Sequence, residues 1–205
     1  MVEPSPRIHP TTLVGQHVEL VPLCASHENG LIAAVSDGAL WQLWYTSIPS
    51  PDRMKAEIER RLALQAAGTM IPFTVIERPS GRVVGMTTYM NIDAAGPRVE
   101  IGSTWYARSV QRTKLNTEAK LLLLSHAFDA LDCLAVEFRT HFINHQSRRA
   151  IERLGAKLDG VLRSHQRASN GTLRDTCVYS IVASEWPTVR SHLEWKLRRG
   201  EAYAP

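Results

Sequence analysis

The alternation of polar and apolar residues is clearest over residues 99–106, VEIGSTWY. Successive side chains of a strand point to opposite sides of a sheet, so this spacing predicts a strand. On it, Glu100, Gly102, Thr104 and Tyr106 share one face. We therefore predict a largely buried strand that carries one carboxylate.

A polar loop and a strongly apolar helix follow this strand. The apolar residues of 116–131 recur at helical spacing, and we expect Asn116 or Thr117 to cap the helix. The hydrogen-bonding side chains of the loop are Arg108, Gln111, Arg112 and Lys114. Backbone N–H groups at a helix start attract anions, so we predict an anion site, with phosphate as the expected anion. Such loops are also often merely solvated, and no glycine-rich signature decides between the two interpretations.

The remaining segments show the same two periodicities. Strands are predicted at residues 16–23, 71–77, 82–90, 134–140, 157–166 and 172–182. Helices are predicted at residues 26–35, 38–43, 52–67 and 144–154. Hairpin turns are expected at residues 79–81 and 169–171. In the helix of residues 52–67, we expect Ile58, Leu62 and Leu64 to face inward and the Arg and Glu residues outward.

The chain contains no internal repeat, linker or low-complexity segment, which favours one α+β domain. We place this domain at residues 13–184, after a loose, proline-rich arm of residues 1–12. A C-terminal helix and tail, residues 185–205, complete the chain. We expect Ser184 to cap that helix and Pro187 to lie in its first turn.

The composition is that of an ordinary globular protein. Hydrophobic residues make up 44% of the chain and charged residues 21%, which argues against wholesale disorder. The net charge of +4 suits an anionic cofactor as well as a nucleic acid. Because the basic residues are scattered and not interleaved with aromatic residues, we expect no nucleic-acid partner.

The three cysteines, Cys24, Cys133 and Cys177, are far apart and form no CxxC pair. We expect them to be reduced thiols of a cytoplasmic protein. No cluster of His, Cys and Asp has the spacing of metal ligands, so no metal is expected. The N-terminal MVEPSPRIHP has no apolar leader segment, and no run of about 18 apolar residues occurs, so we expect neither secretion nor membrane insertion.

Several motifs, together with the order of the elements, are similar to those of one enzyme family. They are VEIGSTWY, QRTKLNTEAK, NHQSRRAIERLGA, GVLR and RDTCVYSI. Over about residues 10–185 the chain resembles the GNAT acyl-CoA-dependent N-acetyltransferases, particularly the RimJ/RimL-like branch of ribosomal-protein N-terminal acetyltransferases. The resemblance implies a GNAT fold with a mixed, mostly antiparallel sheet of about seven strands flanked by helices. It also implies acetyl-CoA as co-substrate.

The resemblance further implies where acetyl-CoA binds. A bulge splays the central strand in this family, and the backbone of residues 104–106 would hold the thioester and the pantetheine arm. The Asn144 side chain would also bind the pantetheine arm, and the Ser147 hydroxyl would lie near the sulfur or the pyrophosphate. The residues expected to bind the cofactor are Thr104, Trp105, Tyr106, Gln111, Arg112, Thr113, Lys114, Leu115, Asn116, Thr117, Asn144, Ser147 and Arg148.

Two features depart from the family pattern. The pyrophosphate loop usually reads Gln/Arg-x-x-Gly-x-Gly/Ala, and this chain has Lys114 and Asn116 at the glycine places. Asparagine tolerates a left-handed backbone and caps helices, whereas the Cβ of Lys114 narrows the approach to a phosphate. Many relatives also have a tyrosine acid where this chain has Ile151. Ser147, a water molecule or Tyr106 would then have to protonate the leaving thiolate.

Acetyl transfer from a thioester to an amine needs a group that removes the amine proton. Glu100 lies in an otherwise apolar strand, and partial burial would raise its pKa so that it accepts this proton directly or through water. The alternative is a structural glutamate bonded to a neighbour. Asn144 can likewise cap its helix, bind the cofactor or do both. Glu100 and Ser147 are our candidate catalytic residues.

Other side chains are candidates for the acceptor site, although each also fits an ordinary core or surface position. They are Trp41, Trp44, Tyr45, His141, His145, Arg163 and His165. His126, on the apolar helix, is expected to be a packed histidine. Trp186 and Trp195, on the last helix, are expected in the core or in a homodimer interface.

We therefore predict a cytoplasmic N-acetyltransferase that moves an acetyl group from acetyl-CoA to a primary amine by direct attack in a ternary complex. A protein N-terminus and a small-molecule amine both fit as acceptor. The alternative is a catalytically weak CoA-binding or regulatory protein on the same fold, favoured by the altered loop and the missing tyrosine. The oligomeric state stays open, with a homodimer through the C-terminal helix as the arrangement we expect.

Overall fold

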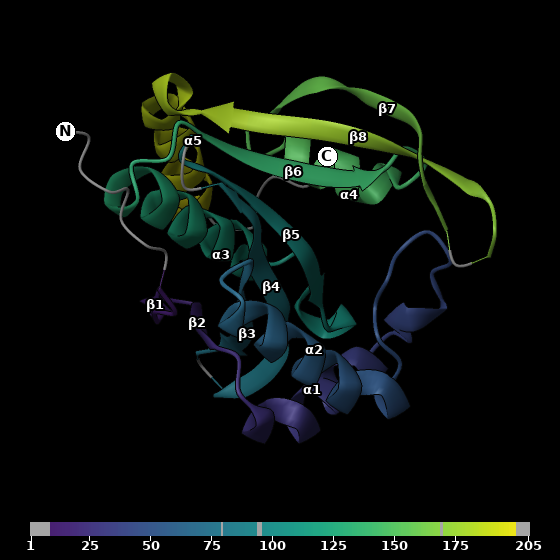
Figure 1. Ribbon diagram of the computed structural model, residues 1–205. Coiled ribbons are helices and arrows are strands. Elements are labelled where there is room, and N and C mark those ends of the chain that lie inside the picture. Colours follow the sequence, from purple (N-terminus) through teal and green to yellow (C-terminus); the bar gives the residue numbers. More distant parts are fainter. Residues whose placement is uncertain (1–8, 79, 94–95, 169, 200–205) are drawn as a thin grey trace.

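A computed structural model describes residues 9–199 of the chain, apart from residues 79, 94, 95 and 169 (Figure 1). Parts of four predictions lie outside the described residues. These are the arm of residues 1–8, Pro79 and Ser169 in the two hairpin turns, and the tail from residue 200.

Within the described residues, eight strands form one mixed sheet. They are β1 (Leu13–Val14), β2 (Val18–Pro22), β3 (Met70–Glu77), β4 (Arg82–Asp93), β5 (Arg98–Tyr106), β6 (Ala135–His141), β7 (Lys157–Arg167) and β8 (Leu173–Val182). Their order in the sheet is β1-β2-β3-β4-β5-β6-β8-β7. The β5–β6 pair is parallel and its neighbours pair antiparallel. The predicted α+β fold with a mostly antiparallel sheet is confirmed, with eight described strands instead of about seven.

Five α-helices are found in the same part of the chain. They are α1 (Glu28–Ser36), α2 (Met54–Ala66), α3 (Lys114–Ser125), α4 (His145–Glu152) and α5 (Trp186–Arg198). A π-helical turn, His126–Ala130, continues α3, and a 3-10 turn, Arg108–Val110, precedes it. The helix predicted at residues 38–43 is a single 3-10 turn, Leu40–Gln42. α1 packs on β4 and α2 on β3, while α3 packs on β2 and α5.

Two adjacent residues of β4 show that α2 and α3 cover opposite faces of the sheet. The Thr88 hydroxyl accepts a hydrogen bond from Arg61 of α2 at 2.6 Å. The Tyr89 hydroxyl donates to the carbonyl of Leu123 in α3. Because neighbouring side chains of a strand point in opposite directions, we call these sides the α2 face and the α3 face. Figure 1 shows the same arrangement, with α1 and α2 on one side of the sheet and α3 and α5 on the other.

α3 begins before the residues predicted to cap it. Asn116 and Thr117 both lie in its first turn, so that prediction was wrong. The cap is Thr113, whose hydroxyl accepts from the backbone N–H of Leu115 at 3.3 Å and donates to the carbonyl of Val110 at 2.8 Å. The preceding 3-10 turn, which leaves no periodic signal in the sequence, sets the start of the helix.

For the two later helices, the predicted N-cap is confirmed in α4 and wrong in α5. The Asn144 side chain accepts from the backbone N–H of Ser147 at 3.0 Å, which confirms it as the cap of α4. Ser184 was predicted to cap α5, but the N-cap residue is Glu185, because a 3-10 turn moves the helix start. Pro187 lies in the first turn of α5 as predicted. The buried Leu193 of this helix belongs to the same apolar core as the sheet.

β5 and β6 pair only at their beginnings. The register runs from Arg98 opposite Ala135 to Glu100 opposite Glu137, and from Ile101 onward β5 has no partner in β6. Figure 1 shows the two strands diverging beyond this point, β6 along the top of the molecule and β5 downward. From Ile101 onward the edge of β5 that faces β6 therefore has no strand partner in β6, and Glu100 is the last residue of the paired segment.

β5 contains a bulge just after the segment that pairs with β6. Thr88 of β4 pairs with Gly102 and Met86 with Trp105, so β5 has one residue more than β4 over this interval. Ser103 has φ of 46°, a left-handed value that fits a bulge. The family resemblance predicted a bulge in this strand, and the register confirms it.

The bulge changes which face of the sheet the later residues of β5 occupy. The alternation predicted Thr104 and Tyr106 on the side of Glu100, and this was wrong. The Thr104 hydroxyl lies 2.8 Å from that of Thr87, and both accept hydrogen bonds from Lys120 of α3. Thr104 and Tyr106 therefore lie on the α3 face, because the extra residue shifts the period of two by one.

Candidate active site

Glu100 lies on the α2 face at the point where β5 and β6 diverge, and only 5% of its surface is exposed. The Asn91 amide donates to its carboxylate at 2.6 Å, and the Arg139 guanidinium forms an ion pair with it at 3.5 Å. Burial raises the pKa of Glu100, and the Asn91 hydrogen bond and the Arg139 charge offset only part of this rise. Glu100 is thus a buried carboxylate with an increased proton affinity, which is the property that a general base for an amine needs.

Gly102 makes room for this carboxylate. A Cβ at this position would lie 2.9 Å from Oε1 of Glu100 and 2.8 Å from the sulfur of Met90. Both distances are shorter than any normal carbon contact. Any larger residue at this place in VEIGSTWY would therefore displace the ends of the Glu100 and Met90 side chains.

The α2 face continues from Glu100 as a row of polar side chains. Glu137 lies opposite Glu100, and His141 of the same strand lies opposite Thr176 of β8. Alternation along the two strands places the whole row on this face. Its members on β6 and β8 are Glu137, Arg139, His141, Arg174 and Thr176. The α2 face therefore carries charged and polar side chains along β6 and β8.

The predicted phosphate loop lies between the end of β5 and the start of α3. The Gln111 amide donates to the carbonyl of Tyr106 at 3.0 Å, so it holds the loop against β5. Arg112 is exposed, with φ of 62°. The carboxylate of Asp37, just after α1, accepts from the backbone N–H of Ser109 at 3.0 Å. The loop is thus fixed from both sides of its 3-10 turn.

The side chains of this loop divide into two groups. Those of Leu115 and Thr117 are buried, with 3% and 8% of their surfaces exposed, so they offer a ligand only their backbone. Arg112, Lys114 and Asn116 stay partly or fully exposed at the first turn of α3. A helix start with two cations beside it attracts an anion of high charge. These donors fit a pyrophosphate, although Lys114 stands at a place where a glycine is usual.

Comparison with known proteins agrees with this geometry. Residues 17–157 match the acetyltransferase (GNAT) domain. The chain belongs to the GNAT acetyltransferase family. The resemblance that its motifs indicated is thereby confirmed.

Three relatives show how close the likeness is. Over 106 residues the chain is 30% identical to the "Putative ribosomal N-acetyltransferase YdaF" of Bacillus subtilis (strain 168), a match that covers 52% of this chain and 57% of that protein. The crystal structure of a GCN5-related N-acetyltransferase from Brucella melitensis is 30% identical, with a TM-score of 0.86 over 98% of this chain and 91% of that one. RimJ of Mycobacterium smegmatis, in complex with CoA-disulfide, shares the fold at 23% identity, with a TM-score of 0.78 over 93% and 98% of the two chains. These relatives support the RimJ/RimL-like branch of the GNAT family.

The second half of the expected GNAT cofactor site is built on α4. Asn144 and Ser147 are half-buried at its start, and Asn144 is engaged in the cap. Arg148 donates to the Tyr179 hydroxyl at 3.0 Å and to the Phe142 carbonyl at 3.2 Å. Through the first of these hydrogen bonds, the Arg148 guanidinium connects α4 to β8.

Sequence reasoning missed Lys120, which belongs to the apolar stretch of α3 but lies beneath the bulge. Only 6% of its surface is exposed, and its ammonium donates to the hydroxyls of Thr104 at 3.1 Å and Thr87 at 3.4 Å. The Thr104 hydroxyl in turn donates to the carbonyl of Gly102 at 3.2 Å, across the bulge. Burial lowers the pKa of Lys120 to about 7. A lysine directly before a run of four leucines, on a helix with an apolar body, was the available signal.

Arg61 holds the bulge from the other face, where the sequence predicted an outward arginine. That prediction was wrong, since Arg61 is 1% exposed. Its guanidinium pairs with Glu57 at 2.7 Å and donates to the Thr88 hydroxyl at 2.6 Å and the Ser103 carbonyl at 3.5 Å. The partner carboxylate and the two oxygen acceptors explain how this charge is buried. The bulge thus has a buried cation on each side.

Several buried polar atoms of β5 and β6 have no hydrogen-bond partner among the described residues. They are Nε1 of Trp105, the hydroxyl of Tyr106, and Nε2 of His141. Burial also raises the pKa of the Tyr106 hydroxyl, so it stays protonated. Such donors cost free energy unless a ligand or water accepts their hydrogen bonds.

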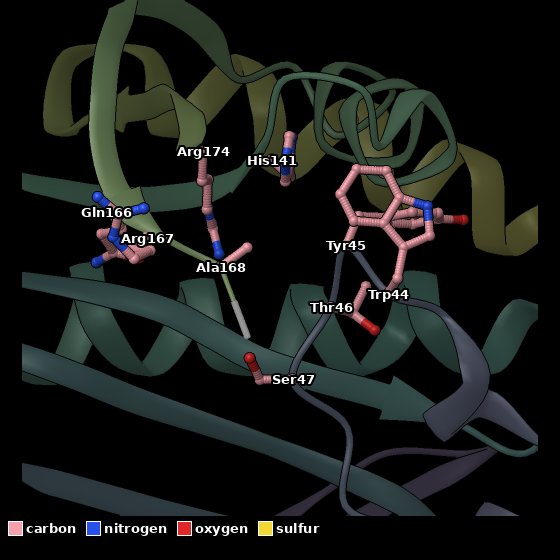
Figure 2. Close-up of a pocket in the computed structure, with 9 residues that line it drawn as sticks. All are labelled: Trp44, Tyr45, Thr46, Ser47, His141, Gln166, Arg167, Ala168 and Arg174. Atoms are coloured by element: carbon pink, nitrogen blue, oxygen red, sulfur yellow. The ribbon is translucent and has the colours of Figure 1, made fainter. Parts of the chain in front are cut away.

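A small pocket lies at the far end of the polar row (Figure 2). It is lined by residues 44–47, by His141 at the end of β6, and by residues 166–168 and Arg174 of the β7–β8 hairpin. The structure therefore brings Trp44, Tyr45 and His141 together, as expected for an acceptor site. The ring of Trp44 meets that of His141 edge to face, with 5.7 Å between the centroids.

The other acceptor candidates lie outside this pocket. His145, Arg163 and His165 are exposed, and Arg163 pairs with Asp175 at 2.6 Å. Trp41 packs against the core. His126 stacks on Tyr89, with 5.9 Å between the rings, which confirms it as a packed histidine.

Neither a metal site nor a membrane-spanning helix is found among the described residues. Among them, no group of three or more His, Cys, Asp or Glu residues could hold a metal ion. No helix in this part of the chain has the length and hydrophobicity needed to cross a membrane.

Proposed function

We propose that this GNAT protein moves the acetyl group of acetyl-CoA to a primary amine by direct attack in a ternary complex, with Glu100 as the general base. The observation that carries this proposal is the buried Glu100 carboxylate, with its raised pKa, at the point where β5 and β6 diverge. A carboxylate with a raised pKa is a stronger base than an ordinary glutamate and can take the proton that the amine loses on attack.

Acetyl-CoA fits the residues beside the unpaired edge of β5 and at the start of α3, and it would supply an acetyl group activated as a thioester. Beyond Glu100 the outer edge of β5 has no strand partner, so its backbone donors are available to the pantetheine arm and the thioester carbonyl. Arg112, Lys114 and the start of α3 would hold the pyrophosphate. Asn144 would bind the pantetheine arm, as in the family pattern.

Ser147 is our candidate for returning a proton to the leaving thiolate. Its hydroxyl lies in the first turn of α4, half-buried and next to Asn144 in the predicted cofactor site. The alternative donor is Tyr106, whose buried hydroxyl has no partner among the described residues. A serine hydroxyl is a weak acid, so its contribution to the rate is expected to be smaller than that of Glu100.

The acceptor that we propose is a protein N-terminus or a small-molecule amine. The name of the Bacillus subtilis relative, a ribosomal N-acetyltransferase, supports the first of these. We further propose a cytoplasmic homodimer through α5, because Trp195 of that helix is 45% exposed while Trp186 is buried in the core. Sedimentation of the parent and of Trp195→Glu, with a loss of mass in the variant, would support the dimer.

The first test is Glu100→Gln, with Glu137→Gln as its matched control on the same face. We expect Glu100→Gln to lower kcat by about a hundredfold or more while the affinity for acetyl-CoA is kept, because the amide cannot accept the proton. Glu137→Gln should retain most of the rate. Full activity in Glu100→Gln would exclude Glu100 as the base.

The second test is calorimetric binding of CoA and acetyl-CoA to the parent, Asn144→Ala and Gln111→Ala proteins. Binding by the parent that both variants weaken would support the cofactor site. Binding without acetylation of any amine would favour the alternative, a CoA-binding or regulatory protein. No binding by the parent at millimolar cofactor would exclude both functions.

A further inference from the structure

The charged side chains that line the pocket at the end of the polar row are all positive among the described residues. Its lining contains two arginines, Arg167 and Arg174, and no carboxylate among the described residues. Arg167 is exposed and donates to the carbonyl of Gly171 at 2.9 Å. Arg174 is half-buried, and Figure 2 shows its side chain directed between His141 and the hairpin. The pocket is therefore electropositive, with Arg174 as its inner cation.

Arg174 lacks a strong acceptor of its own. Its Nε donates to the neutral hydroxyl of Thr176 at 3.1 Å. Burial lowers the pKa of Arg174, and the charge of Glu100, further along the same face, opposes this effect in part. A guanidinium presents several donors in one plane, and a single hydroxyl uses only one of them. The remaining donors are available to a carboxylate.

His141 supplies a second donor with a fixed direction. It is 6% exposed, and its Nδ1 accepts from the backbone N–H of Ile143 at 3.3 Å. Because that nitrogen accepts, the hydrogen of the neutral ring lies on Nε2. Burial and then the charge of Arg174 lower the pKa of His141, which keeps the ring neutral. Nε2 is buried and has no partner in the described part of the chain.

Two adjacent donors without matching acceptors, in a pocket without an acid, indicate the chemistry of the missing group. We propose that the pocket binds a carboxylate of the acceptor, with Arg174 and the Nε2–H of His141 as its donors. The substrate class is thus an amine that carries a carboxylate, either a free amino acid or a peptide with an acidic side chain near its N-terminus. This inference rests on the proposed acetyltransferase function and narrows it.

The aromatic residues at the rim fit the same class. Trp44 lies against His141 and Tyr45 against Trp44, with 5.8 Å between the latter two rings. Trp44 packs on one side of the imidazole and thereby strengthens the hydrogen bond of the ring to an anion. Arg174 and Glu100 lie on the same face, so an acceptor whose carboxylate binds in the pocket would direct its amine along the polar row towards Glu100.

The test compares matched acceptors with the full chain and acetyl-CoA. The pairs are L-alanine against L-alaninamide, and Ala-Glu-Ala-amide against Ala-Gln-Ala-amide. We expect kcat/KM to be about tenfold or more higher for the carboxylate member of one pair, because hydrogen bonds to charged groups are strong. The first pair reports an amino-acid acceptor and the second a peptide acceptor.

Variants show whether the pocket causes this preference. Arg174→Gln should remove it through an increase in KM for the carboxylate acceptor, with the amide acceptor unaffected. Arg149→Gln, an exposed arginine of α4, changes the net charge equally and should keep the preference. Equal rates within both pairs, or a preference that survives Arg174→Gln, would overturn the proposal.

A binding measurement separates this inference from the proposed function. Trp44 contacts His141, so the fluorescence difference between the parent and Trp44→Phe reports on the pocket without turnover. A saturable change with the carboxylate probes and not with their amides supports the carboxylate site, even if acetyl-CoA does not bind. No response to any carboxylate probe, together with no preference in turnover, overturns the carboxylate site alone.

Discussion

At the scale of single residues, the molecule places two buried titratable groups on opposite faces of β5. Glu100 lies on the α2 face with a raised pKa, and Lys120 lies on the α3 face with a lowered one. Both shifts have desolvation as their largest cause. The carboxylate has Asn91 and Arg139 as partners, whereas the lysine bonds only neutral hydroxyls. The burial of Lys120 without a charged partner is therefore expected to lower the free energy of unfolding of the protein.

Lys120→Met is predicted to stabilise the fold, by an amount that depends on pH. The folded pKa of Lys120, about 7, lies below the ordinary lysine value, so the unfolded chain binds more protons between these values. The free energy of unfolding of the parent should thus rise with pH from about 7 to about 10, by up to roughly 4 kcal/mol. The methionine variant should lack this rise, and urea denaturation at several pH values measures it.

The control for this prediction is Lys55→Met on the exposed surface of α2. It removes a lysine without removing a buried charge and should change stability little. A parent whose stability does not rise over this pH range would contradict the buried, uncompensated ammonium.

At the scale of elements, β5 decides the geometry of the candidate site through one extra residue. The bulge at Ser103 moves Thr104 to the α3 face, where Lys120 binds it, and leaves Glu100 and Gly102 on the α2 face. Arg61 binds the Ser103 carbonyl from the other side. Contacts from two helices therefore hold an irregular strand segment in one conformation.

Gly102→Ala is predicted to impair the enzyme more than the fold. The new Cβ would lie within 2.9 Å of the Glu100 carboxylate, which must move away. We expect kcat to fall by about tenfold or more, with the acidic limb of the pH–rate profile displaced, because the environment that sets the Glu100 pKa changes. Steady-state kinetics across pH provides the measurement.

Gly160→Ala in β7 is the matched control, since a Cβ there meets nothing within 4 Å. It should leave both the rate and the pH–rate profile unchanged. If the two variants behaved alike, the close contact between Gly102 and Glu100 would have no functional meaning.

At the scale of the whole molecule, one carboxylate joins the N-terminal strands to the central helix. Glu118 of α3 is 8% exposed and accepts from the backbone N–H groups of Gln16 at 2.8 Å, His17 at 2.6 Å and Val18 at 3.0 Å. These residues are about a hundred positions away in the chain. The contact fixes β2, and with it the edge of the sheet, against α3.

Glu118→Gln is predicted to destabilise the fold by about 2 kcal/mol or more, because its amide nitrogen would face backbone donors that need an acceptor. Chemical denaturation of the parent and the variant measures this difference. Glu59→Gln, on the exposed side of α2, is the control and should lie within about 0.5 kcal/mol of the parent. A similar small effect in Glu118→Gln would show that the N-terminal strands are held by other contacts.

The sequence by itself determined the strands, most of the helices, the α+β class and the family. These follow from periodicity and from motifs, which are local properties of the chain. It also determined the Asn144 cap, and it singled out Glu100 and the loop of residues 107–114 as candidates, because each stands out within a few residues of its neighbours. Where local signals were weak, as at the 3-10 turns before α3 and α5, the predicted caps were wrong.

Only the tertiary structure decided how the groups of the site face one another. The bulge broke the alternation of β5, and the burial of Arg61 and Lys120 could not be read from their charge. Arg174 and His141 lie on separate strands, and their common pocket follows from the pairing of β6 with β8. The physical reason is the same in each case: burial and unpaired donors depend on contacts between residues far apart in the chain, which no local pattern records.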